Sequence, residues 1–320
     1  MHGIGGWSMA IDAQWANVAI LYTFEGANNS TAIVEAKGKT ATVSGNAKIS
    51  TAQYPAGCYS SLLLDGNNCG VSMSSGANFV PGTGDFAVEI PVYLVGDTSA
   101  GNTYTSFIVD CRTTEPQNSK VVIQCHGSNE GAKSNRIGFH SGGIERILSS
   151  TQMGSSFKLV TLARVSGVVR LFIDGVQEGS SYSDTTYYST SFFNTGKRYA
   201  AAGGNDYSFN GHLGPLRMTI NGRGYSSNFT PPSLPFPRPT ISGYVYDSDG
   251  NPVSKAVVAV KRSTLGSPVS AISNGASGAY SLYPSDFSEH IVIKTDSSVY
   301  PLVDGSTVDN ALIYDRVIPG

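Results

Sequence analysis

Residues 168–179, VVRLFIDGVQEG, are the part of the chain most informative about its architecture. Leu171 and Ile173 alternate with Arg170 and Phe172, and this period of two is typical of a β-strand. The Asp174-Gly175 pair that follows is a strong signal for a tight hairpin turn. We therefore expect this strand to pair with the segment directly after the turn.

The same pattern of short apolar runs closed by turn residues extends in both directions along the chain. Only 14% of the residues are charged, 37 are glycine, and no long amphipathic helix is visible. So many short strands predict two packed sheets, and hence an all-β fold. The candidate strands of the first part are 17–24, 41–50, 61–66, 69–74, 86–94, 105–110, 120–126, 136–141, 158–166, 168–175, 197–204 and 214–221.

A proline-rich segment, FTPPSLPFPRPT at 229–240, divides the chain. Its five prolines exclude a helix or a ladder strand and favour a stiff, extended linker. We predict an N-terminal arm at 1–15, a large sandwich at 16–228, a linker at 229–239 and a small sandwich at 240–320. Six short strand candidates in this last part suit an immunoglobulin-like sandwich.

Charge and the termini narrow the classes of partner. The net charge is -2 and the pI is about 6.2, with no cluster of Lys or Arg to contact a nucleic-acid backbone. Residues 1–14 contain neither a basic leader nor a continuous apolar run, so we expect no secretory signal and no membrane span. The apolar arm could dock on a neighbouring subunit or on its own sandwich.

The four cysteines, Cys58, Cys69, Cys111 and Cys125, contain no C-x-x-C pair, so their spacing does not indicate a zinc site. Cys111 and Cys125 close two adjacent strand candidates and could face each other across a hairpin. We favour free, buried thiols.

Several motifs resemble a known family. LYTFEGANNST (21–31), SLLLDG (61–66), GTGDFAVEIPVYL (82–94) and VTLARVSGVVRLFIDGVQEG (160–179), with the region 209–236, occur in an order and spacing similar to the concanavalin-A-like, laminin-G-like jelly roll. The version most similar is found in bacteriophage tail and other virion proteins. This resemblance implies a jelly-roll sandwich with a lectin-like surface.

The last part of the chain resembles a carboxypeptidase-regulatory-like or transthyretin-like sandwich, through ISGYVYDSDGNPVSKAVVAVKR (241–262) and SGAYSLYPSD (277–286). The terminal NALIYDRVIPG (310–320) resembles the ends of many phage structural proteins. Together the resemblances imply a non-enzymatic structural protein of a tailed phage, located in the virion. Its implied partners are other virion proteins, in an oligomeric assembly, and a host-surface glycan. A carbohydrate-binding receptor-recognition module is the alternative.

Two departures from the family pattern bear on any inherited site. Pro91 stands where such jelly rolls usually carry Trp, and Phe157, Lys158 and Leu159 replace the usual Trp-His-His. Because proline cannot donate to a ladder, we expect the strand at 86–94 to lie at a sheet edge or to contain a bulge.

The candidate ligand-binding residues lie in the aromatic region 181–209. Its tyrosines alternate with small polar residues, a mixture that suits stacking on sugar rings and also suits protein interfaces. The third interpretation is structural, with Phe192 and Phe193 in the core. The tyrosines chosen as candidates are Tyr182, Tyr187, Tyr188, Tyr199 and Tyr207.

Calcium is the only cofactor for which the sequence offers candidate ligands. Asp65 and Asp206 lie in polar loops beside asparagines that could add oxygen ligands. Ordinary turns have the same composition, so both interpretations stay open.

We predict no catalytic residue. Glycoside hydrolysis requires two carboxylates on one strand face, but Glu89 stands alone in its strand and the E-x-D-x-x-E pattern is missing. The five histidines have no nucleophile motif beside them. A glycan hydrolase is accordingly the least favoured alternative.

Overall fold

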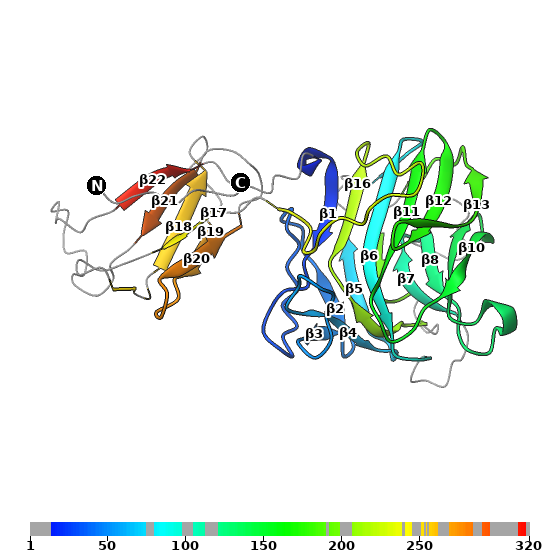
Figure 1. The fold of residues 1–320 in the computed structure, drawn as a ribbon, viewed down its shortest axis with the longest axis horizontal. Helices are drawn as coiled ribbons and strands as arrows, with labels where there is room; N and C mark the ends of the chain where they lie inside the picture. The colour runs from blue at the N-terminus through cyan, green and yellow to red at the C-terminus, as the bar shows by residue number, and fades with distance from the viewer. Residues whose placement is uncertain are drawn as a thin grey trace. The chain divides into compact units, whose positions relative to one another are not determined.

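The structure is a computed structural model that describes residues 14–74, 80–97, 105–112, 121–189, 192–198, 207–238, 241–244, 251–252, 254, 256–261, 269–283, 290–294 and 313–317. The chain divides into two compact units, Ala16–Phe236 and a second unit that contains Pro237–Gly320. Figure 1 shows that both are built almost entirely from strands. The predicted arm at 1–15 lies outside the described residues except for Gln14 and Trp15.

The first unit is a jelly-roll sandwich of two antiparallel sheets, as predicted. The nine-stranded sheet contains β1 (Val18–Tyr22), β3 (Lys48–Ser50), β4 (Ser61–Asp65), β6 (Phe86–Leu94), β11 (Lys158–Val165), β12 (Val168–Ile173), β13 (Val176–Ser183), β15 (Asn210–Leu213) and β16 (Leu216–Ile220). The seven-stranded sheet contains β2 (Thr42–Ser44), β5 (Gly70–Ser74), β7 (Ser106–Asp110), β8 (Val122–Cys125), β9 (Arg136–Ser141), β10 (Ile144–Gln152) and β14 (Phe192–Thr195). The described residues of this unit also form two short 3-10 helices, η1 (Trp15–Asn17) and η3 (Gly131–Lys133).

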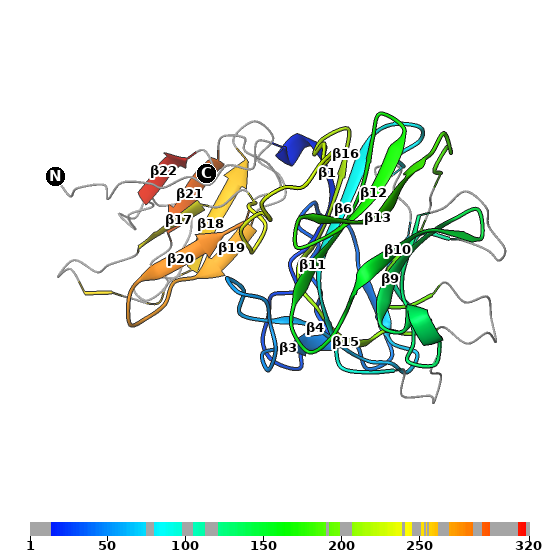
Figure 2. The same ribbon diagram turned by 45° about the vertical axis from the view of Figure 1, so that its right-hand side comes forward.

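Alternation along the strands creates one core between the sheets. In β6, Phe86, Val88 and Ile90 point into that core, which places Ala87 and Glu89 on the opposite, outer face. In β9, Ile137 and Phe139 belong to the same core, so Gly138 and His140 face outward. Figure 2 shows β11–β13 in one layer and β9–β10 in the other.

The hairpin predicted at Asp174-Gly175 is confirmed. Ile173 pairs with Val176, and both turn residues have positive φ angles, 51° and 79°, as a type I′ turn requires. The backbone nitrogen of Phe229 donates to the Gly175 carbonyl at 2.9 Å.

The expectation for Pro91 was wrong in one respect, because β6 is a central strand rather than an edge strand. It pairs with β11 on one side and with β15 and β16 on the other. The Pro91 carbonyl accepts a hydrogen bond from the Gly214 nitrogen at 2.8 Å, where β15 ends and β16 has not begun. The missing N–H therefore faces a break in the ladder, which costs no strand-to-strand hydrogen bond.

Residues 221–236 of the chain cover the central part of the outer face of the nine-stranded sheet. There Glu89, fully buried, forms a two-point ion pair with Arg217 at 2.7 and 2.8 Å. The Tyr225 hydroxyl donates to the same carboxylate at 2.8 Å, and the buried Phe236 ring packs on the Arg217 guanidinium. The segment at 229–239, which we predicted to be a stiff, extended linker between the units, thus belongs to the first unit as far as Phe236.

All four cysteines are buried and free, as we favoured. The alternative pairing fails on register, because Cys125 lies opposite Ser106 while the Cys111 nitrogen bonds to the Val121 carbonyl. Burial raises the pKa of Cys125 to about 12, so this thiol is unreactive at neutral pH.

The described residues of the second unit form a two-stranded and a four-stranded antiparallel sheet. Its strands are β17 (Ile241–Tyr244), β18 (Ala256–Lys261), β19 (Val269–Ile272), β20 (Ala279–Leu282), β21 (His290–Lys294) and β22 (Ile313–Val317). No helix among the described residues has the length and apolar character needed to cross a membrane.

Candidate functional site

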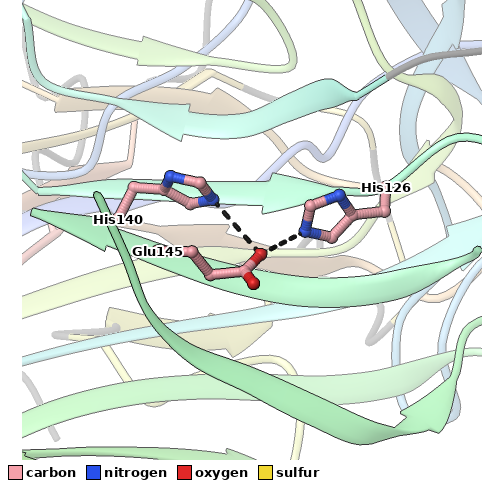
Figure 3. Close-up of side chains that lie close together, drawn as sticks. All are labelled: His126, His140 and Glu145. Carbon is pink, nitrogen blue, oxygen red and sulfur yellow. Dashed lines mark hydrogen bonds and ion pairs between the residues drawn. The ribbon is translucent and has the colours of Figure 1, made fainter. Parts of the chain in front are cut away.

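The outer face of the seven-stranded sheet carries a cluster of charged and imidazole side chains. His126 follows β8 and continues its ladder, because its nitrogen bonds to the Arg136 carbonyl at 2.9 Å. His140 in β9 lies directly opposite Glu145 in β10. These three residues come from three adjacent strands and converge on one point of the face (Figure 3).

His126 lies between two carboxylates. Its Nδ1 is 2.6 Å from Glu130 Oε2, and its Nε2 is 2.5 Å from Glu145 Oε2. Its side chain is only 4% exposed. The Thr105 hydroxyl donates to the other oxygen of Glu130, and Lys133 Nζ pairs with Glu145 Oε1 at 2.8 Å. The two carboxylates thereby fix the orientation of one imidazole ring.

The electrostatics of the cluster keep both carboxylates ionised. Burial raises the pKa of Glu130, but hydrogen bonds from Thr105 and His126 outweigh burial and hold the pKa below its usual value. For Glu145, burial is likewise outweighed by Lys133 and His126, and the pKa is lowered. Loss of hydration on burial, by contrast, lowers the pKa of His140 to about 4. His140 is therefore a neutral imidazole at pH 7.

Gly138 leaves open space beneath these side chains. A β-carbon at this position would lie 3.0 Å from Glu145 Oε2, 3.0 Å from His126 Nε2 and 3.3 Å from His140 Nε2. The three atoms therefore surround one small space that no side chain of β9 fills. Among the described residues, none forms a hydrogen bond with His140 Nε2, although this atom lies 3.5 Å from Glu145 Oε2.

An open pocket of about 630 Å³ adjoins the cluster. Its volume falls within the range of small-ligand sites, and it shares Glu130 and Lys133 with the cluster. The lining residues are Thr105, Phe107, Glu130, Lys133, Arg198 and Tyr207.

Tyr207, one of the predicted ligand-binding residues, lies in this pocket. Its ring is partly exposed and has the Arg198 guanidinium 4.9 Å from its centroid. Its φ angle is 41°, in the left-handed region that is costly for an aromatic residue. The Phe107 nitrogen, which donates to the Tyr207 carbonyl at 3.1 Å, helps to hold this conformation.

The other predicted tyrosines do not join Tyr207 in one patch. Tyr182 in β13 is partly buried beneath Arg146, 4.8 Å from its ring. Tyr187 is 61% exposed and packs over Gly82. Tyr199 lies outside the described residues. The alternating pattern therefore distributes its rings over several surfaces.

Tyr188 is a correction, because it is a core residue and cannot stack on a ligand. It is 1% exposed, its hydroxyl donates to Ser141 Oγ at 3.0 Å, and its ring lies against Phe86 and the Arg164 guanidinium. The structural interpretation is confirmed for Phe193, which is completely buried, whereas Phe192 is only partly buried.

Of the two predicted calcium ligands, the structure describes only Asp65. Asp65 accepts hydrogen bonds from Asn46 Nδ2 at 2.7 Å and from the Asn67 nitrogen at 3.0 Å, which is the geometry of a loop turn. Asp206 lies outside the described residues. Calcium binding stays a prediction.

Sequence reasoning missed His126, Glu130, His140 and Glu145. One signal was present, since Gly142-Gly143 is a two-residue hairpin turn and places His140 opposite Glu145. His126 joins them only through the register of β8 on β9, for which the chain contains no local signal.

No family model matches the chain, and no curated protein matches it. Among solved structures, domain 4 of AbnA, a GH43 extracellular arabinanase from Geobacillus stearothermophilus, is 16% identical with a TM-score of 0.46, over 66% of this chain and 95% of that one. The binding domain of Paraclostridial Mosquitocidal Protein 1 is 14% identical with a TM-score of 0.48, over 95% and 74%. A mutant of Trypanosoma rangeli sialidase is 13% identical with a TM-score of 0.45, over 67% and 32%. At these values none of the three informs the function.

Proposed function

We propose that the first unit is a non-enzymatic glycan-binding module that uses the pocket on the outer face of the seven-stranded sheet. The observation that carries this proposal is the partly exposed Tyr207 ring in a pocket of about 630 Å³. Thr105, Glu130 and Lys133 add a hydroxyl, a carboxylate and an ammonium group, which are hydrogen-bonding partners for sugar hydroxyls.

The strained backbone of Tyr207 supports this assignment. Non-glycine residues at positive φ are enriched at binding sites, where the surrounding structure compensates for the strain. Arg198 restricts the rotation of the ring from one side. A ring held in place loses little entropy when a ligand stacks on it.

A glycan array tests the proposal. The full chain is expected to bind at least one host-surface oligosaccharide, and Tyr207→Ala to weaken binding by about thirtyfold, the effect of losing roughly 2 kcal/mol at a hot spot. Tyr187→Ala removes an exposed ring elsewhere and is the matched control, with binding unchanged. Equal binding by wild type and Tyr207→Ala, at unchanged melting temperature, would contradict the proposal.

The non-enzymatic part of the proposal is supported by the position of Glu89. This carboxylate is completely buried and paired with Arg217, so no substrate can reach it. Glu130 and Glu145, which flank His126, are the carboxylates that a hydrolase would use instead. Release of reducing sugar by the wild type that is lost in Glu145→Gln would establish the hydrolase alternative.

For the whole chain we propose a structural role in the virion of a tailed phage, with the second unit as an immunoglobulin-like adaptor. This role is supported by the motifs at 21–31, 160–179 and 310–320 and by the pairing of two all-β units. Mass spectrometry of purified virions should detect the protein in stoichiometric amounts. Its absence from such particles would refute the role.

A further inference from the structure

We infer that His126, His140 and Glu145 form a binding site for one divalent transition-metal ion, with zinc as the best-matched ion. Their ligand atoms, two imidazole nitrogens and one carboxylate oxygen, lie within 4.8 Å of one another. Two histidines and one glutamate form a donor set that binds zinc and leaves a coordination position open.

The side chains already point in the directions that such a site requires. His126 Nε2, His140 Nε2 and Glu145 Oε2 surround the space above Gly138, each 3.0–3.3 Å from the position of an added β-carbon. Figure 3 shows the three groups turned toward one another. Zinc would replace the hydrogen bond between His126 and Glu145, and each ligand atom would then lie about 2.1 Å from the ion. His140 and Glu145 can adjust, because their side chains are 22% and 18% exposed.

Residues around the ligands supply the outer contacts that metal sites usually have. Glu130 lies 2.6 Å from His126 Nδ1, so it can accept a hydrogen bond from Nδ1–H. The other ring nitrogen, Nε2, is then unprotonated and can bind the ion. The arrangement of carboxylate, histidine and metal is common in zinc sites. His140 Nε2, which forms no hydrogen bond with any residue in the described part of the chain, would gain one ligand bond.

The positive charge of Lys133 is expected to weaken binding of the ion. Its ammonium group lies 2.8 Å from the second oxygen of Glu145 and is 46% exposed. It can move into solvent when the ion binds, but its charge repels a cation. Removing this charge is therefore expected to tighten binding.

Isothermal titration of Zn²⁺ alone into the full chain, freed of metal with a chelator, tests the inference. The wild type should bind one ion per chain. His140→Ala and Glu145→Gln should each lose this binding, Glu130→Gln should weaken it by about ten- to a hundredfold, and Lys133→Met should tighten it. His126→Ala is avoided because the ring is buried.

Two alanine variants separate the metal site from general effects of mutation. Gly138→Ala keeps every ligand but places a methyl carbon 3.0 Å from two of them, so binding should be lost. Gly154→Ala, where nothing lies within 4 Å of an added β-carbon, should bind as the wild type does. Circular dichroism verifies the fold of each variant, and if Gly138→Ala is unfolded, His140→Ala and Glu145→Gln decide.

Co²⁺ provides a second readout, since three protein ligands and a water give the intense visible absorption of a four- or five-coordinate ion. Failure of the wild type to bind Zn²⁺ would overturn the inference. Binding that persists in His140→Ala and Glu145→Gln would also overturn it, because the ion would then lie elsewhere. Neither outcome bears on glycan binding through Tyr207.

Discussion

The outer faces of the two sheets each carry a glutamate in an ion pair, but among the residues that the structure describes only the pair on the nine-stranded sheet is covered by another segment of the chain. On the nine-stranded sheet, Glu89 and Arg217 are both completely buried beneath the segment that ends at Phe236. On the seven-stranded sheet, Glu145 and Lys133 keep 18% and 46% of their side chains exposed next to an open pocket. A buried ion pair that no ligand can reach is costly to break, whereas a charge at an open pocket is available for binding.

The largest expected difference between the faces is in the cost of removing one charge. Arg217→Met removes the two-point ion pair from the buried Glu89 and leaves it only the Tyr225 hydroxyl and the Arg223 guanidinium at 3.8 Å, so it should lower the free energy of unfolding by about 3 kcal/mol. Glu145→Gln on the open face should cost at most about 2 kcal/mol, since water can replace the lost contact. Urea denaturation of both variants measures the two costs, and equal costs would break the comparison.

Aromatic rings should show the same contrast with a smaller effect. Phe236→Ala removes a ring that is 2% exposed and should cost about 3 kcal/mol, with no change in ligand binding to the folded protein. Tyr207→Ala should cost about 1 kcal/mol or less and weaken ligand binding. If Tyr207→Ala lowered stability and Phe236→Ala weakened binding, the roles that we give to the two faces would be contradicted.

The smallest expected change in stability comes from deleting a single hydroxyl group. Tyr225→Phe keeps the ring stacked on Phe229 and deletes the hydroxyl that bonds to Glu89 and Arg223, so we expect a loss of about 2 kcal/mol, as for bonds to charged groups. Thr105→Val deletes the hydroxyl that donates to Glu130 on the open face, where water can substitute, and should cost less. Thermal unfolding of the pair measures the difference.

The fold was predictable because its signals are local. The alternation in 168–173 and the Asp174-Gly175 turn specify a hairpin without any other part of the chain. Pro91 shows the limit of such reasoning, because a proline signals an edge strand unless the partner strand breaks opposite it. That break, between β15 and β16, depends on residues more than a hundred positions away.

The candidate site was predictable only in part, for the same reason. Tyr207 was chosen from its aromatic neighbourhood, but the same neighbourhood contains the buried Tyr188, and composition does not distinguish the two. His140 and Glu145 could have been paired from the Gly-Gly turn between them. His126 could not, because only the pairing of β8 with β9 brings it to Glu145.

The central claim is that ligands bind to the outer face of the seven-stranded sheet and not to that of the nine-stranded sheet. The most direct measurement is NMR mapping of backbone amide shifts in the full chain as it is titrated with an oligosaccharide selected on the array. The account predicts shifts at Phe107, Lys133 and Tyr207, and none at Glu89, Arg217 or Phe236. Shifts at the second set with none at the first would contradict it.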